Sequence, residues 1–477
     1  MAATQSGHDY PVVHISGNAK AILGDAHGVD QAFFDHMNPA DQKNLWLRSL
    51  YYNGMHARPS HINSNASSPG SVEWIWSTNF PEWLESSESF YWITGLPGSG
   101  KSTLMKHIAG GKRTLNHLQR SGYVWTVIQF YFEFRAGNKL PNTLDGLLRT
   151  LLHELVKKVE NVVEGVQLPD MKQIASPYQC MDILCEAILT TDNRICAFID
   201  GLDEFQGPKS ELIHMIYGLE DRCNMKICLA SRPEPIFQEK LLKYPHLAVQ
   251  DHDDESIRQY TDATWISKRI DIRSTLPQLL SDKIRQVSHG VFLWARLAVD
   301  ATLQLYLAGS TAEQLLAAVE KMPRNVEEMY EEMLDRLPQK FKTEAAILIL
   351  IVLDAEDHAE VRKLYFAMQA SLIQLGIGDC ITHLDLNECN QSRLLAILGG
   401  LVDIVQPHRN WFAPLEHVLH RSDRLRLLYE QDKITLSREC VPKVKLHHKT
   451  LHTFLRSSPW LLTNLPCEYS NTYSDYF

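Results

Sequence analysis

The chain has 477 residues, of which 44% are hydrophobic and 22% charged, and its formal net charge is −10. These values are typical of a soluble globular protein of roughly two to four domains. The acidic balance disfavours a general nucleic-acid binder, and no apolar run approaches the roughly 20 residues of a membrane-spanning helix.

The first 72 residues divide into a tail and a helical pre-segment. Residues 1–30 are polar, and positions 12–25 alternate apolar and polar side chains around Gly-Asn and Gly-Asp. That alternation suits either a stacking β-segment or a disordered tail. Residues 31–72 begin with helical periodicity and end in a linker rich in Ser, Asn, Pro and Gly.

Short apolar runs alternate with helical periodicity between residues 73 and 250. Strands are predicted at 90–94, 123–134, 195–199 and 225–230, and helices at 102–109, 144–159 and 181–189. This alternation is typical of a three-layer α/β fold with a parallel sheet between helices.

The pattern becomes helical after residue 250. Helices are predicted at 256–265, 276–287, 291–307, 311–321, 326–337 and 344–353. We therefore expect a helical domain over residues 251–379. The mixed pattern of residues 380–477 is interpreted as a winged-helix-like C-terminal region, and no repeat of 20–50 residues is evident in the sequence.

A glycine-rich segment links the predicted strand at 90–94 to the predicted helix at 102–109. It reads Gly95-Leu-Pro-Gly-Ser-Gly-Lys-Ser102 and matches the pattern G-x-x-x-x-G-K-[ST]. Glycines let successive N–H groups point at phosphate oxygens, and a helix N-terminus favours anions. A chance match is the alternative, but the strand before and the helix after disfavour it. The predicted nucleotide-binding residues are Gly95, Leu96, Pro97, Gly98, Ser99, Gly100, Lys101, Ser102 and Thr103.

Within this segment we expect Lys101 to reach the β- and γ-phosphates, and Ser102 to offer its hydroxyl to Mg²⁺. A cluster of carboxylates, Asp200, Asp203 and Glu204, follows the predicted strand at 195–199. Ligands bind at this end of the strands in parallel sheets. The cluster is interpreted as a magnesium site, since a divalent cation relieves the repulsion among the carboxylates; a solvated acidic turn is the alternative.

The roles of these carboxylates follow from their order. Asp200 is predicted to hold Mg²⁺, and Asp203 and Glu204 to orient or deprotonate an attacking water, with the choice between the two left open. Arg232 follows the strand at 225–230 and is predicted to sense the γ-phosphate. A surface salt bridge is the alternative for Arg232.

At these residues the chain resembles the NACHT-type STAND P-loop NTPases, and most closely their fungal branch. Segments 90–106, 198–204 and 229–233 are similar to that family's phosphate loop, acidic motif and sensor strand. Its helical signatures have counterparts at 148–154, at 290–296, and at 322–323 with 328–334. The resemblance covers roughly residues 40–460. Residues 12–25 also resemble short amyloid-signalling motifs of fungal switch proteins.

This resemblance implies a signal-transduction switch that binds ATP or GTP with Mg²⁺ and hydrolyses it slowly. It further implies a nucleotide held between an α/β domain and a helical lid, self-assembly through the NTPase domain, and a role in fungal non-self recognition or programmed cell death. It places His448 near the β-phosphate and Arg58 and Ile62 beside the base; a structural role is the alternative for all three.

Two other functions fit a phosphate loop. A P-loop kinase of a small molecule would need an acceptor pocket, and a scaffold would hold nucleotide without hydrolysing it. Nine scattered cysteines form no C-x-x-C pair, which disfavours a zinc site, and Cys196 and Cys228 are interpreted as small buried residues. Because the N-terminus also has no signal-peptide pattern, we expect a reducing, cytoplasmic compartment.

Overall fold

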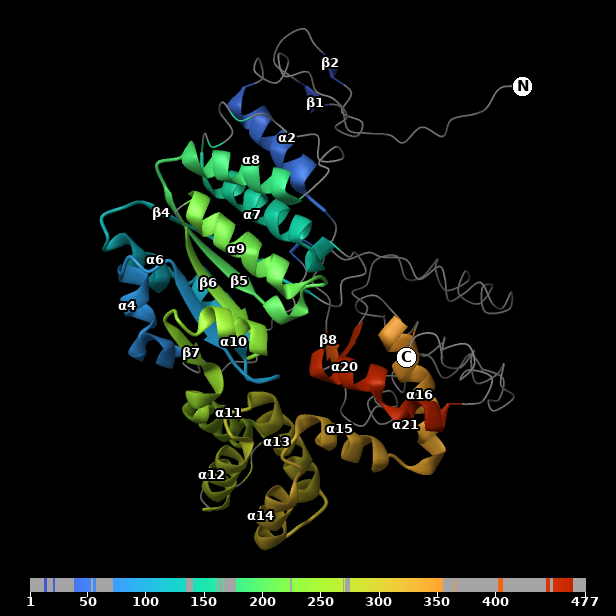
Figure 1. Ribbon diagram of the computed structural model, residues 1–477. Coiled ribbons are helices and arrows are strands. Elements are labelled where there is room, and N and C mark those ends of the chain that lie inside the picture. Colours follow the sequence, from blue (N-terminus) through green and yellow to red (C-terminus); the bar gives the residue numbers. More distant parts are fainter. Residues whose placement is uncertain are drawn as a thin grey trace, which may run out of the picture. The chain divides into compact units, whose positions relative to one another are not determined.

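The computed structural model (Figure 1) describes about two thirds of the chain in separate stretches. They are 38–52, 55–56, 72–133, 140–160, 162, 166, 177–223, 225–268, 270, 275–354, 364, 402–405, 443–446 and 449–465, with the strands β1 (Val13–His14) and β2 (Lys20–Ala21). The chain divides into two compact units. The first comprises Met1–Leu96 and Lys101–Val249, and the second comprises Pro97–Gly100 and Gln250–Phe477.

A five-stranded parallel sheet forms the centre of the first unit. Its strands are β3 (Phe90–Thr94), β4 (Trp125–Tyr131), β5 (Arg194–Asp200), β6 (Lys226–Ser231) and β7 (His246–Ala248). They lie in the order β4-β5-β6-β3-β7, so β6 separates β3 from β5. All five residues of β3 and all six of β6 are buried, as expected of parallel strands that are covered on both faces.

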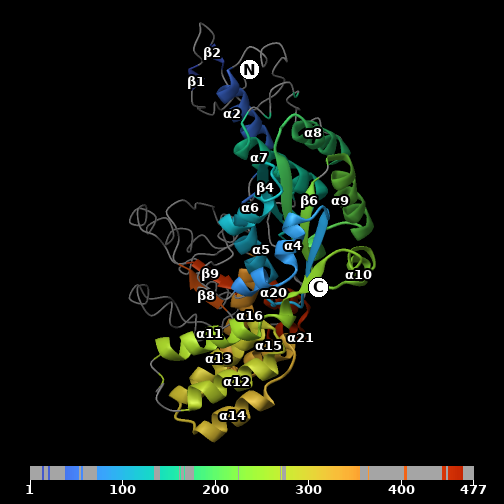
Figure 2. The ribbon, with the colours of Figure 1, turned by 90° about the vertical axis from the view of Figure 1, so that its left-hand side faces the viewer.

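Helices cover both faces of this sheet. Alternate side chains along each strand point to opposite faces, so each strand contributes to two separate cores. One core contains Phe90 and Trp92 of β3 together with side chains of α2, α7, α8, α9 and α10. The other contains Tyr91 and Ile93 with side chains of η2, α4, α5 and α6. Figure 2 shows α8 and α9, which contact each other, running along the sheet.

The predicted helices at 102–109 and 144–159 match the observed bounds within one residue, whereas α8 begins four residues before the predicted 181. The helices of the first unit are α2 (Pro39–Leu50), η2 (Glu73–Ser77), α4 (Phe80–Glu85), α5 (Lys101–Gly110), α6 (Lys112–Gln119), η3 (Leu140–Asn142), α7 (Leu144–Lys158), α8 (Pro177–Leu189), η4 (Leu202–Glu204), α9 (Lys209–Cys223) and α10 (Pro235–Leu241). Helix α7 begins where the Thr143 side chain accepts a hydrogen bond from the Gly146 N–H at 3.1 Å, and its leucine-rich face is buried.

The second unit is mainly helical and has one hydrophobic core. The short helix η5 (Val249–Asp251) begins at the last residue of the first unit. The elements that follow it are α11 (Asp254–Ser267), α12 (Leu276–Ser288), α13 (Phe292–Leu307), α14 (Ala312–Lys321), α15 (Val326–Asp335), α16 (Gln339–Asp354), β8 (Val402–Val405), β9 (Lys443–Leu446), α20 (Lys449–Ser457) and α21 (Pro459–Asn464). Reciprocal hydrogen bonds between Thr311 and Gln314 start α14 with a capping box.

The predicted α/β class, a parallel sheet followed by a helical region, is confirmed. The five domain ranges given above remain predictions. In the predicted winged-helix-like region, β8 and β9 form an antiparallel pair, and most of residues 380–477 lie outside the described residues. Within residues 12–25, β1 and β2 also pair antiparallel. None of the described helices is long and apolar enough to cross a membrane.

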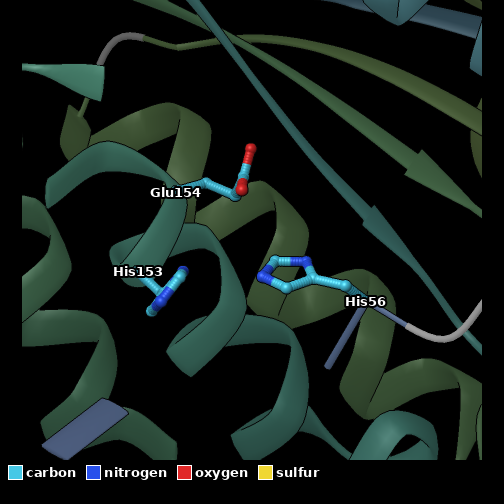
Figure 3. Close-up of side chains that lie close together, drawn as sticks. All are labelled: His56, His153 and Glu154. Atoms are coloured by element: carbon cyan, nitrogen blue, oxygen red, sulfur yellow. The ribbon is translucent and has the colours of Figure 1, made fainter. Parts of the chain in front are cut away.

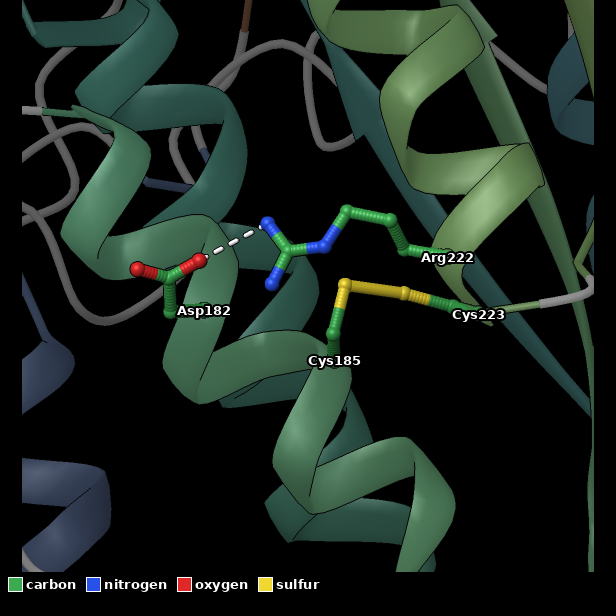
Figure 4. Close-up of a disulfide and its surroundings, with 4 residues drawn as sticks. All are labelled: Asp182, Cys185, Arg222 and Cys223. Carbon is green, nitrogen blue, oxygen red and sulfur yellow. Dashed lines mark ion pairs between the residues drawn. A yellow bond between two sulfur atoms is a disulfide. The ribbon is translucent and has the colours of Figure 1, made fainter.

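The sequence did not predict a disulfide, but one joins α8 to α9. Figure 4 shows Cys185 and Cys223 bonded beside an ion pair, in which Arg222 Nη1 lies 2.7 Å from Asp182 Oδ1. In the reducing compartment expected from the sequence, these two cysteines would be free thiols. Cys196 and Cys228, by contrast, are buried free thiols, as predicted.

Reduction of this disulfide is expected to lower the free energy of unfolding of the first unit. The bonded cysteines are 38 residues apart, and the loop-entropy model gives a loss of about 4 kcal/mol for that spacing. Denaturant unfolding with and without dithiothreitol measures the difference. A C185A/C223A double variant is the control, because its stability should not respond to the reductant. An equal response of both proteins would contradict the assignment.

Candidate functional site

The predicted phosphate loop lies between β3 and α5, as the motif requires. Gly98 and Gly100 adopt φ values of 77° and 91°, in the left-handed region that glycine tolerates best. The Ser99 side chain is fully buried, and its hydroxyl has no hydrogen-bond partner among the described residues. A buried hydroxyl without a partner is the kind of group that a phosphate oxygen would satisfy.

The tip of the loop, Pro97–Gly100, belongs to the second unit. Within that unit the Gly98 carbonyl accepts a hydrogen bond from the Leu293 N–H at 3.0 Å, at the start of α13. A methyl group added at Gly98 would lie 2.6 Å from Leu293 Cβ. Together with its positive φ, this close approach explains why glycine occupies position 98.

The acidic segment forms a tight turn after β5. Asp200 is the last residue of the strand and is 1% exposed, and Glu204 is 6% exposed. Gly201 adopts φ 78°, donates its N–H to the Ala230 carbonyl at 2.9 Å, and accepts from the Glu204 N–H at 2.8 Å. The left-handed glycine thus reverses the chain into η4 and keeps the carboxylates at the C-terminal end of the sheet.

Lys209 holds this turn from α9, a role that the sequence analysis missed. Its Nζ donates to the carbonyl oxygens of Leu202 at 3.2 Å, Asp203 at 2.8 Å and Phe205 at 2.8 Å. A signal was present, because a lysine in the first turn of a helix opposes the helix dipole and needs another partner. The three carbonyl groups supply that partner.

Arg232 pairs with Asp203. The Arg232 Nε lies 3.0 Å from Asp203 Oδ2, and the Arg232 backbone N–H donates to Asp203 Oδ1 at 3.2 Å. The Asp203 side chain is 8% exposed and that of Arg232 is 31% exposed. The predicted sensor and one of the two predicted base candidates therefore form a single ion pair at the ends of β5 and β6.

Lys101 of the loop contacts loop carbonyl groups and is influenced by the charged residues of the acidic turn and by Arg232. Its Nζ donates to the carbonyl oxygens of Gly95 at 2.7 Å and Leu96 at 3.0 Å. Burial lowers the pKa of Lys101 to about 8, while the negative charges of the acidic turn partly oppose this effect. The charged groups that act on Lys101 are Asp203, Asp200, Arg232 and Glu204. The structure thus brings all the charged residues of the predicted site into one electrostatic cluster.

Oxygen donors dominate what this cluster offers a cation. Ser102 and Thr103 lie in the first turn of α5, which contacts β5, and Asp200 ends that strand. A hydroxyl and carboxylates are the hard ligands that Mg²⁺ prefers, so these residues fit a magnesium ion. His448, Arg58 and Ile62, for which the resemblance implied nucleotide contacts, lie outside the described residues.

Nucleotide affinity is expected to depend on pH through Lys101. With a pKa of about 8, Lys101 loses its charge above that pH, whereas a neighbouring phosphate would raise its pKa and favour the protonated form. Affinity should therefore be nearly full below pH 7 and fall about 10-fold between pH 7 and pH 9. Calorimetric titration across this range measures the fall. Lys101→Arg is the control, because a guanidinium stays charged throughout. Constant wild-type affinity would contradict the expectation.

The parallel sheet, with a glycine-rich loop that connects β3 to α5, has the arrangement of a P-loop NTPase-like fold. In agreement, a family model described as "Nephrocystin 3, N-terminal" matches residues 70–232, which include the loop and the acidic turn. This match covers less than half of the chain. No curated protein matches the sequence.

Solved structures with a related arrangement include the ORC1 protein of Aeropyrum pernix in complex with DNA, with TM-score 0.34 and 13% identity over 86% of this chain and 98% of that one. A STAND protein with a tetratricopeptide repeat sensor from Pyrococcus horikoshii has TM-score 0.36 and 12% identity over 83% of this chain and 44% of that one. Because both TM-scores lie below 0.5, these matches carry no conclusion about function.

Proposed function

We propose that this chain is a nucleotide-dependent signal-transduction switch of the STAND type, which binds ATP or GTP with Mg²⁺ and hydrolyses it slowly. The observation that carries the proposal is the position of Lys101, which belongs to the phosphate loop and interacts with Asp200, Asp203 and Glu204. A positive charge near three carboxylates, in a glycine-rich loop between a strand and a helix, suits a polyphosphate and its counter-ion.

Nucleotide binding is assigned to residues 95–103. Lys101 now donates to the loop carbonyls of Gly95 and Leu96, and phosphate oxygens would replace these acceptors with charged ones, which form stronger hydrogen bonds. The buried Ser99 hydroxyl adds a donor to the same loop. Ser102 and Asp200 are the proposed Mg²⁺ ligands. When bound, Mg²⁺ supplies neutralisation of the charge that develops on the transferred phosphoryl group.

Hydrolysis is assigned to Glu204 as the general base. Asp203 is the weaker candidate, because both of its carboxylate oxygens already contact Arg232. Lys209 fixes the turn that carries Glu204 and is a positioning residue. A buried carboxylate in a rigid turn is suited to accept a proton from a water molecule held next to it.

Switching is assigned to Arg232. Its guanidinium is about one third exposed and is paired with a carboxylate, so a γ-phosphate would compete with Asp203 for the same cation. Loss of the γ-phosphate would return Arg232 to Asp203. The ion pair is thus an element with two states, biased by the nucleotide. We extend the proposal to self-assembly of the NTPase domain in the cytoplasm and to fungal non-self recognition or programmed cell death, on the family resemblance alone.

The test is phosphate release from ATP and GTP by the purified chain with Mg²⁺ and no added acceptor. Release of phosphate to water supports the switch. Turnover only after a small-molecule acceptor is added would assign the site to a kinase instead. Tight binding without release would assign it to a scaffold. Mass spectrometry of the nucleotide that remains bound through native purification identifies the base.

A further inference from the structure

Three side chains that can bind a metal ion meet in the first unit, on elements that the proposed nucleotide site does not use. They are His153 and Glu154 of α7, and His56 from the short described stretch 55–56 that follows α2 in the chain (Figure 3). Their candidate ligand atoms all lie within 4.8 Å of one another. The rings of His56 and His153 are 5.4 Å apart between centroids and inclined by 56°. We propose that these three residues bind a divalent transition-metal ion such as Zn²⁺.

The candidate ligand atoms lie within 4.8 Å of one another and would have to approach further to form a site. Ligand atoms around a tetrahedral zinc ion lie about 3.3 Å apart, given zinc–nitrogen bonds of about 2.0–2.1 Å. Figure 3 shows the three side chains close together, and rotation of the side chains would have to close the remaining gap. His56 itself is exposed.

His153 gives an independent reason to expect a ligand. Its side chain is on the leucine-rich, buried face of α7, and the residue is 7% exposed. Its Nδ1 is buried and has no hydrogen-bond partner among the described residues. Buried polar atoms in folded proteins almost always have a partner, and a metal ion would supply one here.

Glu154 is held in place by a neighbouring lysine. Lys158 Nζ lies 2.6 Å from Glu154 Oε2 and also donates to the Val127 carbonyl at 2.9 Å. This ion pair orients the carboxylate, and a carboxylate can bind a cation through its second oxygen. Lys158 also neutralises part of the negative charge, so we expect a dissociation constant of about 1–10 μM rather than the tighter binding of structural zinc sites.

The ligand types select the metal. Two imidazoles and one carboxylate suit Zn²⁺ and its first-row neighbours, whereas Mg²⁺ and Ca²⁺ prefer oxygen donors alone. Three protein ligands leave the fourth tetrahedral position to water.

A bound metal ion would link the segment that carries His56 to helix α7 of the first unit. The segment before His56 already docks on α7, since Tyr52 is buried and its hydroxyl lies 2.8 Å from Thr150 Oγ1. Met55 is also buried. A metal ion shared by His56 and α7 would fix the end of this segment.

The test is calorimetric titration of the full chain with Zn²⁺, together with X-ray absorption of the Zn²⁺-loaded protein. We expect one equivalent bound in the micromolar range, two imidazoles and oxygen around the metal, and binding about 100-fold weaker in His56→Ala. Because His56 is exposed, this variant should fold, which circular dichroism checks. His153→Gln should also lose the site and keeps much of the side-chain volume.

His107→Ala is the matched control. His107 is another partly exposed histidine near a carboxylate, with Nε2 3.4 Å from Glu73 Oε1, and it belongs to no such cluster among the described residues. Its replacement should leave Zn²⁺ affinity unchanged. Wild-type affinity in His56→Ala, sulfur in the first coordination shell, or no binding below about 100 μM would each overturn the proposal.

Discussion

Replacing Glu204 with glutamine is expected to lower kcat for nucleotide hydrolysis by about 100- to 10,000-fold. Glu204 is buried in a turn that is fixed by the Gly201 carbonyl and by Lys209, so the amide should occupy the same position. Glutamine cannot accept a proton from water, but it keeps the shape of the site. Nucleotide affinity should therefore change by less than about three-fold.

Phosphate release and calorimetric titration of the same preparations separate these two effects. Glu186→Gln is the control, because Glu186 is an exposed residue of α8 and its loss of charge should change neither value. Hydrolysis at the wild-type rate in Glu204→Gln would remove Glu204 from the proposed mechanism and return Asp203 to consideration.

Replacing Lys101 with alanine is expected to weaken nucleotide binding at least 10-fold, about 1.4 kcal/mol. The amine is a positive charge of the loop on which the three carboxylates act, and alanine would leave the β- and γ-phosphates without that counter-charge. The carboxylates would then repel the nucleotide with less compensation.

Calorimetry with ATP and GTP measures the loss. Lys112→Ala provides the control, since Lys112 is an exposed residue at the start of α6. Unchanged affinity in Lys101→Ala would mean that residues 95–102 are a chance match to the phosphate-loop pattern.

Local patterns predicted the parts of the site that lie within one strand or turn. The buried run at 90–94, the glycine-rich loop after it and the helix from Lys101 all follow from neighbouring residues. The predicted strand at 195–199 is longer by one residue at each end, so Asp200 belongs to the strand itself. This places Asp200 at the C-terminal end of an interior strand of the sheet.

Contacts that depend on how strands and helices are placed could not be read in the same way. The Arg232–Asp203 pair follows from the register of β5 and β6, in which Asp200 lies beside Ala230, and the sequence does not encode register locally. Strand β7 has only three residues, too few for a periodicity, and is defined by its pairing with β3. The disulfide joins cysteines 38 residues apart.

In the proposed site, the phosphate loop and Asp200 bind one polyphosphate–magnesium unit. The most direct test is nucleotide titration with Mg²⁺ and with EDTA, for the wild-type chain and for Asp200→Asn. We expect Mg²⁺ to strengthen wild-type binding at least about 10-fold, and most of this gain to disappear in Asp200→Asn. An equal gain from Mg²⁺ in both proteins would contradict the claim, because the ion would then not depend on Asp200.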